Sequence, residues 1–143
     1  MTTAQTCMSD QIIVVDTSEI CEGKLEELKT ALRELVEFVE ANEADPIAYN
    51  IYFDEDGTRM TVVQIHPSSA SMELHMNVAG PVFRKFTELV KLSRVDFYGK
   101  PSSAVLDQMR RKGELLGNAP VVVNELHAGF ARLGHGVAPD DAG

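Results

Sequence analysis

The stretch IAYNIYFDEDGTRMTVVQIH, residues 47–66, decides how this chain folds. On each side of the DEDG turn, apolar and polar residues alternate, which is typical of two half-buried β-strands joined as a hairpin. A two-residue loop would place Tyr49 opposite Gln64, whereas a three-residue loop ending at Gly57 would place Tyr49 opposite Val63. The second register joins the apolar faces of the two strands, so we expect that register.

Strand and helix patterns alternate on both sides of this hairpin. A β-branched run precedes it, followed by leucines and valines at three- and four-residue spacing, which indicates an amphipathic helix. Serines after Pro67 can cap a second helix, which Gly80-Pro81 should interrupt. The expected order is a strand at 12–15, a helix at 22–42, the hairpin at 47–66, a helix from 69 continued by a segment at 82–90, a strand at 92–98, a helix at 102–112 and a strand at 120–123.

This order is β-α-β-β-α-β followed by a helix and a strand. It predicts an α+β, ferredoxin-like fold with one antiparallel sheet and helices on one face. The length of 143 residues suits a single domain. We expect that domain to span 11–133, with a flexible tail at 1–10 and a disordered tail at 134–143.

The chain is acidic, with 13 Lys and Arg against 22 Asp and Glu and a net charge of −9. We therefore expect no nucleic-acid partner and no membrane contact. Basic residues are nevertheless concentrated in 84–112 and acidic ones in 19–45, either as solvated helix faces or as complementary charge across a homodimer. Cys7 and Cys21 form no CxxC pair and the N-terminus lacks a signal pattern, so we expect free thiols and a cytoplasmic protein.

The alternation within the strands divides their side chains between two faces of the sheet. The face expected under the helices carries Ile47, Tyr49, Ile51, Phe53, Val63, Ile65, Val95 and Phe97. The second face carries Asn50, Tyr52, Met60, Val62, Gln64, Arg94, Asp96 and Tyr98. This second face mixes apolar and hydrogen-bonding groups. It is therefore either an exposed or dimer-forming surface or the wall of a small-molecule pocket.

The element order, the D-E-D-G hairpin and the stretch IHPSSASMELH at 65–75 resemble the antibiotic biosynthesis monooxygenase-like branch of the dimeric α+β barrel superfamily. The resemblance covers 11–99 and implies two subunits whose sheets pack into a barrel, each with a pocket. Members include cofactor-free oxygenases of aromatic polyketides and haem-degrading oxygenases. His75 matches the family histidine near the helix centre. The chain departs from the family in having no Trp and in continuing with a further helix and strand.

We expect a small-molecule-binding homodimer whose ligand is a small aromatic or hydrophobic compound, with no cofactor and no metal site. The open alternatives are an oxygenase acting on a small aromatic or quinol substrate, and a haem-binding protein. His75 is the expected catalytic residue. The other expected site residues lie toward the second face of the sheet and would bind the substrate: Asn50, Tyr52, His66, Arg94 and Tyr98.

Overall fold

The computed structural model describes residues 10–132. Of the two predicted tails, at 1–10 and 134–143, only Asp10 is among the described residues. Cys7 and His135 lie outside them. The observed elements are β1 (Ile12–Ile20), α2 (Leu25–Asn42), β2 (Ala48–Phe53), β3 (Arg59–His66), α3 (Ser69–Ala79), the 3₁₀ segment η1 (Gly80–Phe86), β4 (Val90–Tyr98), α4 (Ser103–Leu116) and β5 (Val121–Asn124).

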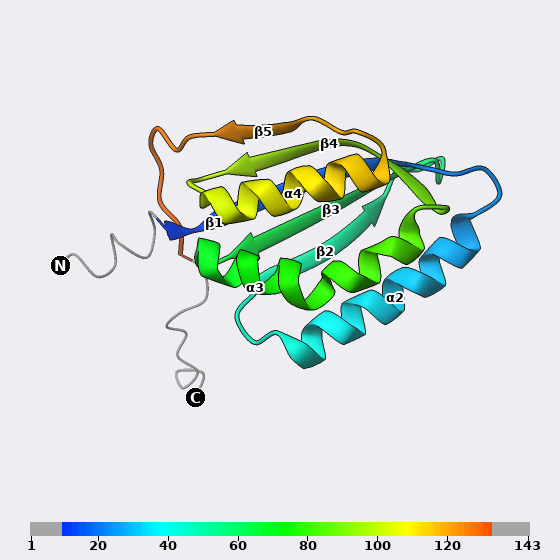
Figure 1. Ribbon diagram of the computed structural model, residues 1–143, viewed down its shortest axis with the longest axis horizontal. Helices are drawn as coiled ribbons and strands as arrows, with labels where there is room; N and C mark the ends of the chain where they lie inside the picture. The colour runs from blue at the N-terminus through cyan, green and yellow to red at the C-terminus, as the bar shows by residue number, and fades with distance from the viewer. Residues whose placement is uncertain (1–9, 133–143) are drawn as a thin grey trace.

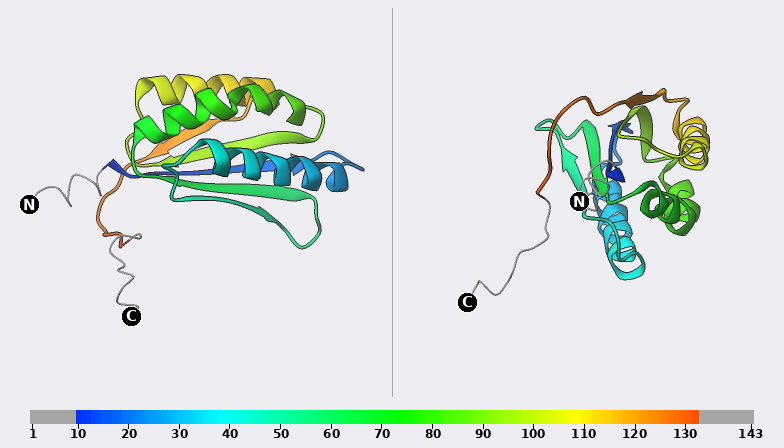
Figure 2. Two further views of the ribbon diagram at one scale, coloured as in Figure 1. Left: turned by 90° about the horizontal axis from the view of Figure 1, so that it is seen from below. Right: turned by 90° about the vertical axis from the view of Figure 1, so that its left-hand side faces the viewer.

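These elements form two layers, a five-stranded sheet and a layer of helices that all cover one of its faces (Figures 1 and 2). The strand order is β2-β3-β1-β4-β5, with β1 antiparallel to both of its neighbours. The predicted α+β order and one-sided helix layer are confirmed. The sheet is mixed, because the α4 crossover returns the chain so that β5 pairs parallel to β4.

Helix α2 presents the predicted apolar stripe to the sheet. Its buried residues are Leu28, Leu32, Leu35 and Val39, which repeat every three or four positions. Helices α3 and α4 start as their serines predict: Ser68 Oγ accepts a hydrogen bond from Ser71 N, and Ser102 Oγ accepts one from Val105 N.

The interruption at Gly80-Pro81 is also confirmed. Gly80 keeps helical dihedral angles, φ −49° and ψ −48°, directly before the proline. A side chain at this position would clash with the proline ring in that conformation, and glycine has none. The chain therefore continues from α3 into η1 with Pro81 in its first turn, and η1 brings Phe83 and Phe86 into the core.

The hairpin register differs from the predicted one. Tyr49 pairs with Gln64, which is the alternative that the apolar alternation disfavoured. The cause is Asp54, whose Oδ1 accepts hydrogen bonds from both Thr58 N and Arg59 N at 3.0 Å. The Asp54 carbonyl also accepts from Gly57 N at 3.1 Å, and Gly57 has a φ of 69°. These backbone donors, Arg59 N first, lower the pKa of Asp54 and fix a longer loop than predicted.

The shift by one residue turns every β3 side chain to the opposite face from the predicted one. Met60, Val62, Gln64 and His66 are buried under the helices, whereas Val63 and Ile65 lie on the uncovered face. The assignments on β2 and β4 hold, with Tyr49, Ile51, Phe53, Val95 and Phe97 toward the helices. Ile47 precedes β2 and is exposed.

Candidate functional site

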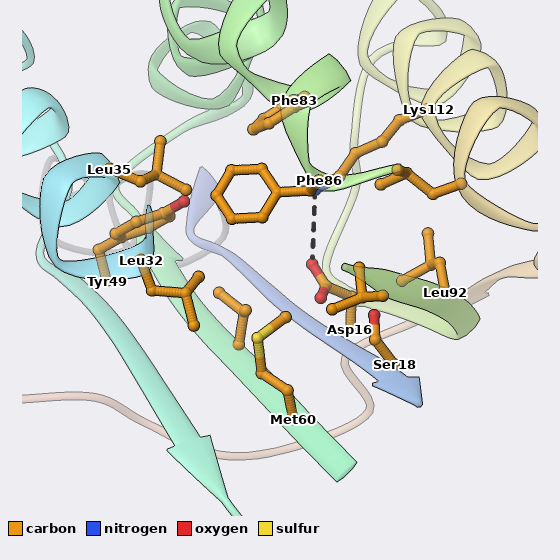
Figure 3. Close-up of a pocket in the computed structure, with 13 residues that line it drawn as sticks. Asp16, Ser18, Leu32, Leu35, Tyr49, Met60, Phe83, Phe86, Leu92 and Lys112 are labelled. Carbon is orange, nitrogen blue, oxygen red and sulfur yellow. Dashed lines mark ion pairs between the residues drawn. The ribbon is translucent and has the colours of Figure 1, made fainter. Parts of the chain in front are cut away.

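A cavity of about 40 Å³ lies between the sheet and the helices (Figure 3). Most of its wall is apolar, and its largest members are Leu32, Leu35, Met60, Phe83, Phe86 and Leu92. In this state its volume suits one or a few waters, since about 10–15 Å³ of such space holds one water. Four polar side chains also border it, from three different elements: Asp16 and Ser18 of β1, Tyr49 of β2 and Lys112 of α4. We call this region the interior compartment.

Asp16 and Lys112 form an ion pair across the compartment. Asp16 comes from the central strand β1 and Lys112 from α4, and their Oδ2 and Nζ atoms are 3.7 Å apart, the dashed line in Figure 3. Their side chains are 4% and 11% exposed. At this distance Asp16 Oδ2 is buried without a hydrogen-bond partner among the described residues. Burial raises the pKa of Asp16, while Lys112 and, more weakly, His75 act to lower it.

A second buried charge arrangement joins α2 to α3. Glu43, the residue after α2, accepts hydrogen bonds from His75 Nδ1 at 3.0 Å on each carboxylate oxygen. Both side chains are buried. Because Nδ1 carries the donated hydrogen, the opposite ring nitrogen can either accept a hydrogen bond or hold a second proton. That atom, His75 Nε2, is buried and has no hydrogen-bond partner within residues 10–132.

His66 is satisfied within the chain. Its Nε2 donates to Gln64 Oε1 at 2.9 Å, because an amide oxygen can only accept, and its Nδ1 accepts from the Ser71 hydroxyl at 2.7 Å. Burial, and then the charge of His75, lower the pKa of His66 to about 4. His66 is therefore a neutral structural histidine at physiological pH.

Tyr49 connects the histidine to the compartment. Its ring centroid lies 5.2 Å from that of His75, and its hydroxyl points toward the cavity between Leu35 and Phe86 (Figure 3). Burial, followed by the charges of Asp16 and Glu43, raises the pKa of Tyr49 above its ordinary value. The hydroxyl therefore stays protonated and can donate a hydrogen bond into the compartment.

The structure does not bring the predicted site residues together. His66 and His75 are fully buried on the helix side of the sheet. The other four lie on β2 and β4 positions that face away from the helices: Asn50, Tyr52, Arg94 and Tyr98. The six predicted residues therefore do not line one pocket over the second face. The β3 register carries His66 to the inner face, and His75 belongs to α3, which covers that inner face.

On the uncovered face, Arg94 is engaged by its own strand neighbour. Its Nε and one terminal nitrogen donate to the two carboxylate oxygens of Asp96 at 2.8 and 3.1 Å. This bidentate pair lowers the pKa of Asp96 and raises that of Arg94. The edge of the guanidinium that carries Nε is thus already occupied by Asp96.

Sequence reasoning missed Asp16, Glu43 and Lys112 as polar members of the interior, and it placed Tyr49 under the helices without a role at the site. One signal was present for Asp16. The predicted first strand ended at Val15, but continuing its alternation from Ile12 and Val14 places Asp16 on the same buried face. Nothing in the sequence pattern pairs Asp16 with Lys112, because the two are 96 positions apart.

Residues 10–132 contain no group of three or more His, Cys, Asp or Glu side chains placed to hold a metal ion. Among the helices of the same region, none combines the length and the apolar character that crossing a membrane requires.

No protein-family model matches the chain, and no curated protein matches it in sequence. Solved structures do match it. MupZ from Pseudomonas fluorescens superposes with a TM-score of 0.67 at 19% identity, over 86% of this chain and 95% of MupZ. SnoaB, a cofactor-independent oxygenase from Streptomyces nogalater, gives 0.55 at 10% identity, over 66% and 96%. A Deinococcus radiodurans protein provisionally assigned as an antibiotic biosynthesis monooxygenase gives 0.51 at 16%, over 64% and 94%.

These solved structures differ in how much of this chain they match. Residues 1–98 make up about 69% of the chain, so the 86% match to MupZ must continue beyond β4. The matches to SnoaB and the Deinococcus protein are no longer than that first part. The chain therefore shares an α+β fold with these solved structures, as its sequence predicted.

Proposed function

We propose that this protein is a homodimer that binds a small aromatic or otherwise apolar molecule in the interior compartment of each subunit. A polar group on the apolar part of that molecule, such as a hydroxyl, would meet Asp16, Lys112 and Tyr49. The observation that carries the proposal is the buried Asp16 Oδ2 beside a cavity, with no hydrogen-bond partner in the described part of the chain.

Burying the Asp16 carboxylate in this way costs stability. A buried carboxylate without full hydrogen bonding is expensive, and a shifted carboxyl pKa beside a cavity is typical of functional sites. A purely structural core would place an apolar residue on β1 between Val14 and Ser18. The Tyr49 hydroxyl and the Lys112 ammonium are the complementary donors for a ligand oxygen.

An aromatic ligand is larger than the cavity of about 40 Å³, so side chains must move when it binds. Met60 and Lys112 are the flexible members of the wall, since an unbranched side chain can adopt several rotamers. The proposal therefore implies an opening movement.

Oxygenase activity is a second candidate function, and the buried bases favour it. In its cofactor-free form, a phenol and O₂ give a quinone and water: one oxygen atom enters the ring, and the phenolic proton and a ring hydrogen leave in the water. A base near the hydroxyl promotes this reaction by forming the electron-rich phenolate. Asp16 is placed for that role. His75 lies behind Tyr49 and would act through it.

The haem-binding alternative has less support. His75 is fully buried, and its ring packs at 5.2 Å from Tyr49 and 6.0 Å from Phe83, measured between ring centroids. A haem iron could reach His75 Nε2 only if these rings were displaced. We therefore do not include haem in the proposed function.

Titration with 1-naphthol and with naphthalene tests the proposed binding site. Tyr49→Phe should weaken 1-naphthol binding by about two- to tenfold, the effect of one hydrogen bond, and leave naphthalene binding unchanged. Tyr52→Phe and Tyr98→Phe make the same change on the uncovered face. If either of them weakens binding while Tyr49→Phe does not, the ligand lies on the sheet's other face and the proposal is wrong.

An oxygen electrode separates the two candidate functions in the same samples. An oxygenase that accepts 1-naphthol consumes O₂ at a rate that falls in Asp16→Asn. A binding protein shows saturable binding with no O₂ uptake above the protein-free control.

The uncovered sheet face supports the homodimer. After the register correction, it carries Ile13, Val15, Val63 and Ile65, all partly exposed, with Tyr52 at 53% and Tyr98 at 42% exposure. Contiguous apolar surface of this kind is typical of an interface. Met60 and Val62, which the sequence placed in this patch, belong to the core instead.

Light scattering should give about twice 15.7 kDa for the wild-type protein. Val63→Lys places a charge in the middle of the uncovered face and should give the monomer mass. Thr30→Lys adds the same charge on the exposed side of α2 and should leave the dimer intact. A wild-type monomer at micromolar concentration contradicts the proposal.

A further inference from the structure

A second hollow lies on the outer side of the helix layer. It is an open groove of about 540 Å³ between the α3–η1 segment and α4, with Met76, Gly80 and Leu115 among its apolar lining residues. Figure 1 shows α4 running beside α3 in front of the sheet. The groove volume lies in the range of small-molecule sites, which is about 300–1,000 Å³. We call it the outer groove.

Positive charge gathers in the outer groove. Arg84 of η1 and Arg111 and Lys112 of α4 line it, against a single acid, Glu114. Within residues 10–132, neither Arg84 nor Arg111 forms an ion pair. The concentration of basic residues in 84–112 therefore contributes to one concave surface, in addition to solvated helix faces.

Two residues belong to both hollows. Phe83 and Lys112 line the outer groove and also the interior compartment. The Lys112 ammonium lies 4.2 Å from the centroid of the Phe83 ring while it also faces Asp16. These two side chains form the partition between the groove and the compartment. Only a movement of these two side chains could therefore connect the groove with the compartment at this point.

We infer that the outer groove is the entrance to the interior compartment and recognises an anionic group on the ligand. The ligand class is an amphiphilic molecule with an apolar ring system and one carboxylate, sulfonate or phosphate. Arg84 and Arg111 bind the anion, and the apolar part passes Phe83 into the compartment. This inference rests on the proposed function and adds the substrate class and the entry side.

Two fluorescent probes that differ by one charged group test the inference. These are 8-anilinonaphthalene-1-sulfonate and N-phenyl-1-naphthylamine, which is the same molecule without the sulfonate. Arg84→Gln and Arg111→Gln should each weaken sulfonate binding by about two- to fivefold, as expected for partly exposed charge pairs. Binding of the neutral probe should not change. The effect of either substitution should shrink as salt is added.

The chain provides a matched control beside each arginine. Lys85 and Arg110 are exposed cations next to Arg84 and Arg111 in sequence, but they do not line the outer groove. Lys85→Gln and Arg110→Gln should therefore leave sulfonate binding nearly unchanged. Circular dichroism of all four variants verifies that the fold is retained.

The other outcomes overturn the inference. Equal losses in all four variants would mean that the probe senses only the overall charge. Equal losses for both probes would mean that the arginines do not recognise the anion. If neither probe binds, the groove is not an entrance for such molecules, while 1-naphthol binding still decides the proposed function independently.

Discussion

Replacing Leu32 by alanine should lower the free energy of unfolding by about 2–5 kcal/mol. Leu32 is buried in the middle of the α2 stripe and packs over the sheet. The loss combines the transfer of the removed methyl groups to water with the cavity that they leave behind. Urea denaturation monitored by circular dichroism measures it.

The matched control is Glu37→Ala on the exposed side of the same helix. It should change the unfolding free energy by less than about 0.5 kcal/mol, because no buried group is affected. Similar losses in both variants would mean that α2 is rotated about its axis relative to the structure. Because Leu32 also lines the interior compartment, its truncation should in addition enlarge the space available to a ligand.

Lys112→Met should be about as destabilising at neutral pH, by about 3–5 kcal/mol, because it leaves the Asp16 carboxylate buried without its counter-charge. The methionine fills a similar volume, so the effect is electrostatic. The double variant Asp16→Asn, Lys112→Met removes both charges and should recover most of the lost stability. Lys85→Met, which breaks an exposed pair with Glu34, is the control and should have little effect.

The loss of stability in Lys112→Met should increase as the pH rises from acid to neutral. Burial raises the pKa of Asp16 above its ordinary value of 3.8, so its protonated form favours the folded state. The contribution of protonated Asp16 to the free energy of unfolding is fully present below pH 3.8 and is lost as the pH rises through the folded-state pKa of Asp16. Without Lys112 the folded-state pKa rises further. The penalty should therefore be small in acid and grow toward neutral pH in urea titrations, and a penalty independent of pH would rule out the ion pair as its cause.

The hairpin shows where local pattern stops being informative. Alternation located both strands, but it could not select between two registers that differ by one residue. The decision belongs to Asp54, whose carboxylate binds two backbone N–H groups across the turn. This local side-chain contact outweighs the preference for matching apolar faces. Gln64 and His66 are tolerated on the buried face because they form a hydrogen bond with each other.

In the candidate site, too, local sequence patterns did not reveal the contacts, which here join residues far apart in the chain. His75 was identifiable from its place in a stretch that resembles a known family, but its burial and its partner were not. Glu43 follows a helix whose other charged residues are exposed, and its sequence neighbours Ala44 and Asp45 give no sign that it is buried. The contact with His75 exists because α2 and α3 pack side by side on the sheet.

The sequence by itself determined the element order, the helix starts at serines, the apolar stripe of α2 and the break at Gly80-Pro81. Each depends on residues within a few positions of one another, where periodicity, capping and backbone sterics act. Only the tertiary structure decided which face each β3 residue takes, that Asp16 meets Lys112, and that Phe83 and Lys112 separate a basic groove from an apolar cavity. The Asp16–Lys112 pair and the partition of Phe83 and Lys112 arise from packing between segments that are distant in the chain. The β3 register arises from the hydrogen bonds of the Asp54 carboxylate in the turn, which the alternation of apolar and polar residues does not reveal.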